Sequence, residues 1–228
     1  MTRKQFLALL LTLSASTTVV AEVPRWIHDA AISPDGSTVA FSYKGDIFTV
    51  PVAGGQALQI TSNDAYEGKP VWSPDSKNIV FLSNREGSDD LFITSAKGGT
   101  PRRLTTHSGS EFPLTFLNDN TLLFTANILP GKKTSRAPFS TQLYTINTDQ
   151  DNSRPRLYLS LPVVAASANS EGKLLYQDRK GYEDVLRKHE RSSVTGDIWL
   201  YDNGKFRQLT TFNGGDQSPT WGKGDSYY

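Results

Sequence analysis

A proline turn followed by an apolar strand recurs along this chain, and this repeat restricts the possible folds more than any other feature. Ser33-Pro34-Asp35-Gly36 returns forty residues later as Ser73-Pro74-Asp75-Ser76, and an apolar run follows both. Proline presets φ for the second position of a type I turn, and Asp and Gly suit the later positions. Each copy therefore predicts a β-hairpin at the same place in a repeated unit.

The rest of each unit also repeats: a third strand that starts with Asp, a double-glycine turn, and a fourth strand that ends with Thr. The first two units show this order as Asp46, Gly54-Gly55 and Thr61, and as Asp90, Gly98-Gly99 and Thr105. Two weaker copies follow, with turns at Asn118-Asp119-Asn120 and at Asn169-Ser170-Glu171-Gly172. A fifth copy begins at Ser218-Pro219-Thr220-Trp221, and Tyr227-Tyr228 falls inside its second strand.

The strands favour one all-β architecture. Residues 79–82 are apolar at consecutive positions, so both faces of their sheet need to be covered. Four-stranded antiparallel sheets of about 40 to 45 residues, each covered by its neighbours, are the blades of a β-propeller. A β-sandwich is the alternative, but it would show cleaner alternation of apolar and polar residues. We predict four blades at about residues 25–66, 67–110, 111–163 and 164–215, and a fifth begun at 216–228.

Aromatic residues recur at fixed places in the second and third strands. They could form a stacking platform for a ligand or pack one blade against the next. Because they recur in every unit, packing is the favoured interpretation. The two sets are Phe41, Phe81, Phe124 and Tyr176, and Phe48, Phe92, Tyr144 and Trp199.

The first 21 residues are typical of a secretory signal peptide. Arg3 and Lys4 precede an apolar run over residues 6–13, and small side chains lead to a cleavage site after about Ala21. A core helix or a membrane anchor is the alternative, but a spanning helix needs about 20 apolar residues. We therefore predict an exported, periplasmic protein whose propeller occupies residues 22–228.

The charge balance gives no reason to expect a nucleic acid or an anionic membrane as partner. Lys and Arg number 24 against 23 acidic residues, and loss of Arg3 and Lys4 with the signal leaves 22 against 23. The chain has no cysteine, so an oxidising compartment would leave no disulfide in it.

One connection lengthens along the chain. The step from second to third strand grows from 5 residues (Phe41 to Asp46) to 9, 18 and 21 in the later units. In an antiparallel blade this connection lies opposite the Ser-Pro turns, so the insertions 128–141 and 180–196 should share one face. Loops on a rigid scaffold often bind ligands, although plain surface decoration is the alternative.

The second insertion contains the candidate substrate-binding residues. Arg187, Lys188, His189 and Arg191 stand beside the hydroxyl-bearing stretch 192–195. Such a cluster could bind an anionic group such as a peptide carboxylate, or it could be a solvated loop.

Catalytic motifs are not found. The three histidines, His28, His107 and His189, have no metal-ligand spacing, and no Gly-x-Ser-x-Gly sequence occurs. His107 and Ser108 are adjacent, which does not make a catalytic triad. We expect no catalytic residue, metal or cofactor in this chain.

Several stretches resemble a known family. The unit from Pro70-Val71-Trp72-Ser73-Pro74-Asp75 to Leu104-Thr105 resembles blades of TolB, dipeptidyl-peptidase and tricorn propellers. Residues 41–47, 175–181 and 187–202 are more specific, and are similar to the first propeller of bacterial exported tricorn-like proteases. Gly196 departs from this resemblance, because an arginine is expected there.

The resemblance implies a non-catalytic propeller, part of a ring of six blades, that gates or positions peptides for a serine-type peptidase domain beyond this chain. It also implies a PDZ domain between them. A TolB-like propeller that binds a protein partner is the alternative, but such proteins place an α/β domain before the propeller.

Association is a further expectation. A blade buries its apolar faces only against its neighbours, so a segment without all its blades should form homo-oligomers or aggregate. We expect the first blade to present Val39, Phe41, Ile47 and Phe48 on its open face.

Overall fold

A computed structural model of the chain describes residues 26–128, 141–181, 194–212, 214–222, 224 and 226–228. Within these ranges the regular structure consists of sixteen strands. They form four sheets, each with four antiparallel strands in the order of the chain. The chain is therefore an all-β propeller of four-stranded blades, as the repeat predicts.

Each blade takes four consecutive strands. Blade 1 contains β1 (His28–Ile32), β2 (Thr38–Tyr43), β3 (Asp46–Pro51) and β4 (Leu58–Gln59). Blade 2 contains β5 (Glu67–Trp72), β6 (Asn78–Ser83), β7 (Asp90–Ser95) and β8 (Arg102–Arg103). Blade 3 contains β9 (Glu111–Asn118), β10 (Thr121–Ala126), β11 (Gln142–Asn147) and β12 (Arg156–Leu159). Blade 4 contains β13 (Val163–Ala168), β14 (Leu174–Asp178), β15 (Ile198–Asp202) and β16 (Lys205–Gln208).

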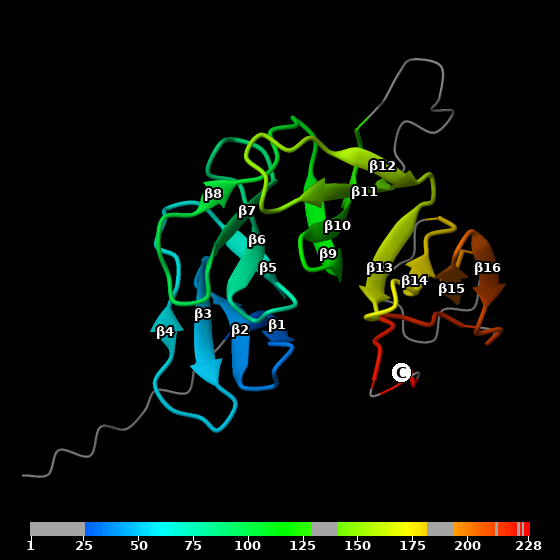
Figure 1. Cartoon of the computed structure of the whole chain (residues 1–228), viewed down its shortest axis with the longest axis horizontal. Helices are drawn as coiled ribbons and strands as arrows, with labels where there is room; N and C mark the ends of the chain where they lie inside the picture. Colours follow the sequence, from blue (N-terminus) through cyan, green and yellow to red (C-terminus); the bar gives the residue numbers. More distant parts are fainter. Residues whose placement is uncertain (1–25, 129–140, 182–193, 213, 223, 225) are drawn as a thin grey trace, which may run out of the picture.

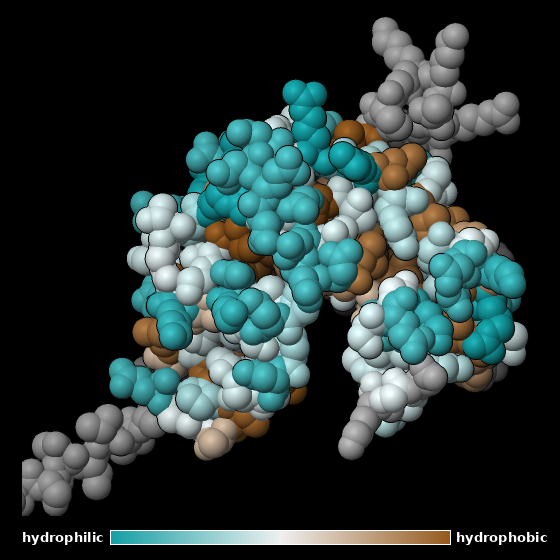
Figure 2. All heavy atoms as spheres, viewed as in Figure 1, coloured by the Kyte–Doolittle hydropathy of each residue, from teal (hydrophilic) through white to brown (hydrophobic). Residues whose placement is uncertain are grey.

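The blades follow one another around an arc (Figure 1). The first strand of each blade contacts the first strand of the next, so that β1 meets β5, β5 meets β9, and β9 meets β13. Blades 1 and 4 lie on either side of the opening of this arc, which the space-filling view shows as a notch (Figure 2). After blade 4, Trp221 and Tyr227 form an isolated antiparallel bridge, where the fifth repeat begins.

The Ser-Pro-Asp turns are held by the Asp side chain. In blade 2, the Ser73 hydroxyl donates to Oδ1 of Asp75 at 2.6 Å, and the Lys77 backbone N–H donates to the same oxygen at 3.1 Å. Blade 1 repeats both bonds around Asp35, at 2.6 and 3.0 Å. The motif that identifies the repeat in the sequence is therefore a local hydrogen-bonded unit that starts each hairpin.

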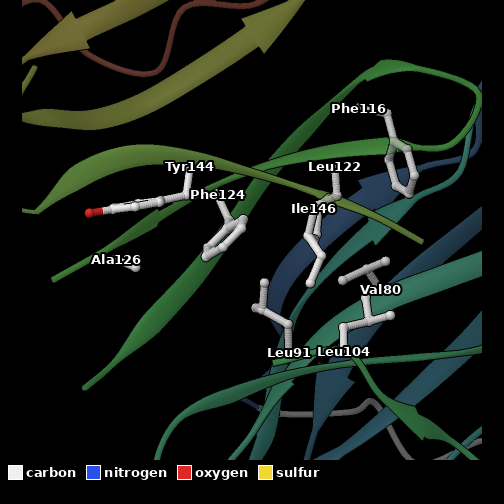
Figure 3. Packing of buried hydrophobic residues seen from close by; sticks show 9 residues of the cluster. All are labelled: Val80, Leu91, Leu104, Phe116, Leu122, Phe124, Ala126, Tyr144 and Ile146. Carbon is white, nitrogen blue, oxygen red and sulfur yellow. The ribbon is translucent and has the colours of Figure 1, made fainter. Parts of the chain in front are cut away.

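The predicted packing role of the aromatic pairs is confirmed at two seams between blades. Phe81 and Phe92 stack with ring centroids 6.1 Å apart and pack into the core between blades 1 and 2. In the next seam, Phe124 and Tyr144 of blade 3 lie in one cluster with Val80, Leu91 and Leu104 of blade 2 (Figure 3).

The prediction that Ile47 lies on the open face of blade 1 is wrong. Ile47 is fully buried in the core shared with blade 2. It lies opposite Ser42 in β2, whereas Phe48 lies opposite Phe41, and the rings of Phe48 and Phe41 stack 5.8 Å apart. Adjacent residues of a strand point to opposite faces, so Ile47 and Phe48 cannot share one.

Candidate functional site: the insertion end of the blades

The two kinds of connection lie at opposite ends of every blade. Antiparallel pairing places the turn between first and second strands at one end, and the connection between second and third strands at the other. The described ends of the two long connections, at Ile128 and at Lys180, belong to the second of these ends. We call it the insertion end.

The four candidate residues Arg187, Lys188, His189 and Arg191 fall within 182–193, outside the described residues. The structure describes the chain on both sides of this stretch, at Lys180–Gly181 and at 194–196. It therefore defines the base of the blade 4 insertion.

Two aspartates organise this base. Oδ1 of Asp178 accepts the backbone N–H of Asp197 at 2.8 Å, and Oδ2 accepts the indole N–H of Trp199 at 3.1 Å. The carboxylate of Asp197 in turn accepts hydrogen bonds from Nζ of Lys180 and from Nε2 of Gln208. Side chains from β14, β15 and β16 thus fix the two points between which the insertion runs.

The structure gives a reason why position 196 holds glycine and not the expected arginine. A Cβ atom at this position would lie 3.0 Å from the carbonyl oxygen of Asp178 and 3.2 Å from side-chain atoms of Gln177. The Gly196 carbonyl also accepts the backbone N–H of Asp216, 3.0 Å away, which ties blade 4 to the chain that follows it. The close backbone approach favours glycine here.

The bond from Asp216 to Gly196 is one of a repeated set at the insertion end. The first residue of β5, Glu67, donates its backbone N–H to the carbonyl of Gly45 at 2.8 Å, and Glu111 of β9 donates to that of Asp89 at 3.0 Å. All three donors are acidic residues five positions before an aromatic residue. This spacing was not among the predicted features. It is visible in the printed chain as Glu67 with Trp72, Glu111 with Phe116, and Asp216 with Trp221.

Buried ion pairs stand at this end of blade 2. The guanidinium of Arg85 contacts the fully buried carboxylate of Glu67 and lies 4.6 Å from the ring centroid of Phe92. The guanidinium of Arg103 contacts the buried Asp90 at 2.6 Å. Because burial outweighs this pairing, the pKa of Asp90 is raised above its ordinary value, against the effects of Ser88 and Arg103.

Glu111 has the largest pKa shift among the acids that the structure describes. Its side chain is fully buried, and among the described residues no arginine or lysine forms an ion pair with it. Burial, with a smaller contribution from the Asp90 charge, raises the pKa of Glu111 to about 7, although the Thr105 hydroxyl and Arg103 lower it. This carboxyl is therefore poised between its neutral and charged forms near neutral pH.

Polar hollows lie along the outer part of blade 3. One, of about 290 Å³, lies between blades 2 and 3, and its lining includes Arg102, Arg103 and Arg154. Another, of about 420 Å³, has Arg156 and Thr145 in its wall. Arg102 is engaged by the carbonyl of Thr148, so part of this positive charge is already used in holding the β11–β12 turn.

The described part of the chain holds no group of three or more His, Asp or Glu residues placed to bind a metal ion. His107 uses its Nδ1 to accept the backbone N–H of Gly109 at 3.0 Å. No helix with the length and apolar character of a membrane span occurs in the ranges that the structure describes.

Comparison with known proteins gives a family match over almost the whole chain. The model of the tricorn protease N-terminal beta propeller domain matches residues 24–228. Tricorn protease homolog 1 of Streptomyces coelicolor is 32% identical over 77 residues, which are 34% of this chain and 7% of that protein. Dipeptidyl-peptidase 5 of Porphyromonas gingivalis is 33% identical over 119 residues, which are 47% of this chain and 17% of that protein. The matched stretches thus cover less than a fifth of the length of each of these peptidases.

Solved structures share the fold. The tricorn protease structure aligns with a TM-score of 0.67 and 20% identity, over 86% of this chain and 19% of that one. A TolB from Agrobacterium tumefaciens, described as putative, aligns with a TM-score of 0.61 and 22% identity, over 82% of this chain and 66% of that one. At these identities the likeness is one of fold.

Proposed function

The chain belongs to the family of the tricorn protease N-terminal β-propeller domain, and from this membership we propose that it is the non-catalytic propeller of a periplasmic tricorn-like serine peptidase. In this proposal the signal peptide 1–21 directs export, and the propeller gates or positions peptides for C-terminal PDZ and peptidase domains of the same protein. The observation that carries it is the family match over residues 24–228, which includes all four blades. Its relatives among known proteins are peptidases.

Within this proposal, Arg187, Lys188, His189 and Arg191 bind the peptide. The support is chemical and positional. Three cations and a histidine suit a carboxylate, since charge-assisted hydrogen bonds are about twice as strong as neutral ones. The stretch that contains them starts and ends at the insertion end, where Asp178 and Asp197 hold its base.

The test compares two variants of the whole protein that each lose three positive charges. The first is Arg187→Gln/Lys188→Gln/Arg191→Gln. The second, the control, is Lys77→Gln/Lys97→Gln/Lys205→Gln, three exposed lysines at the opposite end of the blades. The first should raise KM for a long acidic peptide about tenfold and leave kcat for a short fluorogenic peptide unchanged. Equal effects of the two variants on KM would refute the peptide-binding role. A further variant, His189→Asn, measures the contribution of the imidazole separately.

A TolB-like binding module is the second candidate function, favoured by the structural match over 66% of a TolB chain. The two candidates differ in chemistry. A serine peptidase should react covalently with a fluorophosphonate probe and hydrolyse peptides, whereas a binding module should do neither. Probe labelling of the whole protein, followed by peptide turnover of the same sample, decides between them.

A further inference from the structure

Strand pairing aligns the same positions in blades 2, 3 and 4. Glu67 at the start of β5 lies opposite Ser83, and Glu111 at the start of β9 lies opposite Ala126. Two residues beyond these partners stand Arg85 in blade 2 and Ile128 in blade 3. In blade 4, Asp178 lies opposite the first residue of β13, and the residue two positions after Asp178 is Lys180.

At this position blade 3 therefore has an apolar residue where blades 2 and 4 have a cation. Arg85 pairs with Glu67, and Lys180 pairs with Asp197. Ile128 instead packs against the apolar core between blades 2 and 3. Glu111 keeps the buried position of Glu67, but in the described part of the chain no arginine or lysine forms an ion pair with it as Arg85 does with Glu67.

The charged groups that act on Glu111 come from blade 2. Asp90 at the start of β7 repels its charged form, while Arg103 of β8 is already in contact with Asp90 at 2.6 Å. The residue opposite in β10 is Ala126, and the nearby His107 accepts the N–H of Gly109. Glu67 and Arg85 of blade 2 are paired with each other.

Glu111 also belongs to the contact between the two blades. Its backbone N–H donates to the carbonyl of Asp89, and the neighbouring Ser110 hydroxyl donates to Oδ2 of Asp89 at 3.1 Å. These bonds join the start of β9 to the β6–β7 connection. A charge on Glu111 would stand inside this joint, beside Asp90, while Arg103, the cation that acts on it, is already paired with Asp90.

We propose that Glu111 is a proton-dependent latch between blades 2 and 3, closed while its carboxyl carries a proton and loosened when the proton leaves. The proposal stands apart from the function proposed above. The loosened contact lies at the insertion end, between the start of β9 and the β6–β7 connection.

The direction follows from linkage. The closed form has a pKa of about 7 against an ordinary value of 4.5, so it binds the proton more tightly than an open, solvated form. The proton's contribution to closure is therefore fully present at pH values below the ordinary pKa. It weakens as the pH rises towards and through the pKa of the closed form. Between pH 6 and pH 8, opening of the joint should increase about tenfold.

Hydrogen exchange of the whole protein measures this opening directly. Peptides that cover the start of β9 and the β6–β7 connection are followed at pH 6, 7 and 8, after correction for the intrinsic effect of pH on exchange. The wild-type protein should show the tenfold rise, and a change below twofold would overturn the proposal. Glu111→Gln, which mimics the protonated form, should keep the joint closed at all three pH values; a rise equal to that of the wild type would also overturn it.

Two more variants separate the latch from a general loss of stability. Glu67→Gln removes an acid that is already paired, so it should loosen blade 2 at every pH and leave the rise at β9 intact. Ile128→Lys places a cation where Arg85 and Lys180 stand, and should reduce the rise to less than twofold. If Glu67→Gln abolishes the rise at β9, or if Ile128→Lys leaves it unchanged, Glu111 is not its source.

Discussion

The indole N–H of Trp72 donates a hydrogen bond to the carbonyl oxygen of Ala31, 3.0 Å away and 41 residues earlier in the chain. Trp72 ends β5 and Ala31 lies in β1, so the bond joins the first strands of two adjacent blades. Trp221 makes the same contact with the carbonyl of Ser167 in β13, at 2.9 Å. The tryptophan five residues after Glu67 or Asp216 therefore links its unit to the blade before it.

Trp72→Phe should destabilise the contact between blades 1 and 2. The substitution keeps an aromatic ring but removes the donor, so the Ala31 carbonyl loses a partner in a half-buried place, at a cost of about 1–3 kcal/mol. Chemical denaturation measures the loss. Trp26→Phe is the matched control, because Trp26 is 80% exposed and its replacement should change stability by less than about 0.5 kcal/mol. Equal losses in the two variants would show that the bond contributes nothing.

Thr105→Val should also destabilise the propeller, through a different bond. The buried backbone N–H of Leu91 donates to Oγ1 of Thr105 at 2.9 Å, and valine keeps the shape of the side chain without its oxygen. An unpaired buried N–H costs about 1–3 kcal/mol. Thr105→Ser should retain most of the stability, and Thr106→Val, at the exposed next position, should be neutral in the same denaturation experiment. A neutral Thr105→Val would contradict the prediction.

The repeat could be predicted from the sequence because its turn is a local structure. Ser73, Asp75 and Lys77 make their hydrogen bonds within five residues, so the sequence motif by itself specifies the turn. The terminal threonines Thr61, Thr105 and Thr210 also act alike in three blades, each accepting the backbone N–H of the second residue of the Asp-Ile or Asp-Leu pair.

Features that depend on pairing between strands could not be predicted in the same way. The sequence pattern predicts the wrong face for Ile47, because apolar residues at consecutive positions of a strand do not indicate which face meets which blade. Glu111 is visible as an acid, but its missing cation becomes clear only when Ala126 is known to lie opposite it. The proposed binding residues, including Arg187, stay a prediction because they fall outside the described residues.

Asp75→Asn should weaken the blade 2 turn at neutral pH and have little effect in acid. The hydrogen bond from Ser73, followed by that from the Lys77 backbone, lowers the pKa of Asp75. Because the pKa is lowered in the folded protein, the charged carboxylate stabilises the turn at pH values above the ordinary pKa of 3.8. This stabilisation is lost as the pH falls through and below that value. Because this side chain is well exposed, the contribution should be less than about 1 kcal/mol.

Thermal unfolding of the wild type and Asp75→Asn at pH 7 and pH 2.5 checks this. The gap between the two midpoints should be present at pH 7 and close at pH 2.5. An equal gap at both values would mean that the asparagine disturbs the turn for a reason other than charge.

A side chain at position 196 should destabilise the base of the blade 4 insertion, whatever its charge. The first atom of any side chain, Cβ, would lie 3.0 Å from the Asp178 carbonyl oxygen, so the backbone of β14 or of the insertion base would have to move. Crowding of this kind costs about 1–3 kcal/mol. Gly196→Ala and Gly196→Arg share this atom, so thermal unfolding should show similar losses for both, with faster hydrogen exchange at the Asp216 N–H that Gly196 accepts. The arginine is the residue that resemblance to tricorn-like proteases leads one to expect here. If arginine restores what alanine loses, its guanidinium gains an ion pair at this base that outweighs the crowding, and the glycine is not explained by close approach.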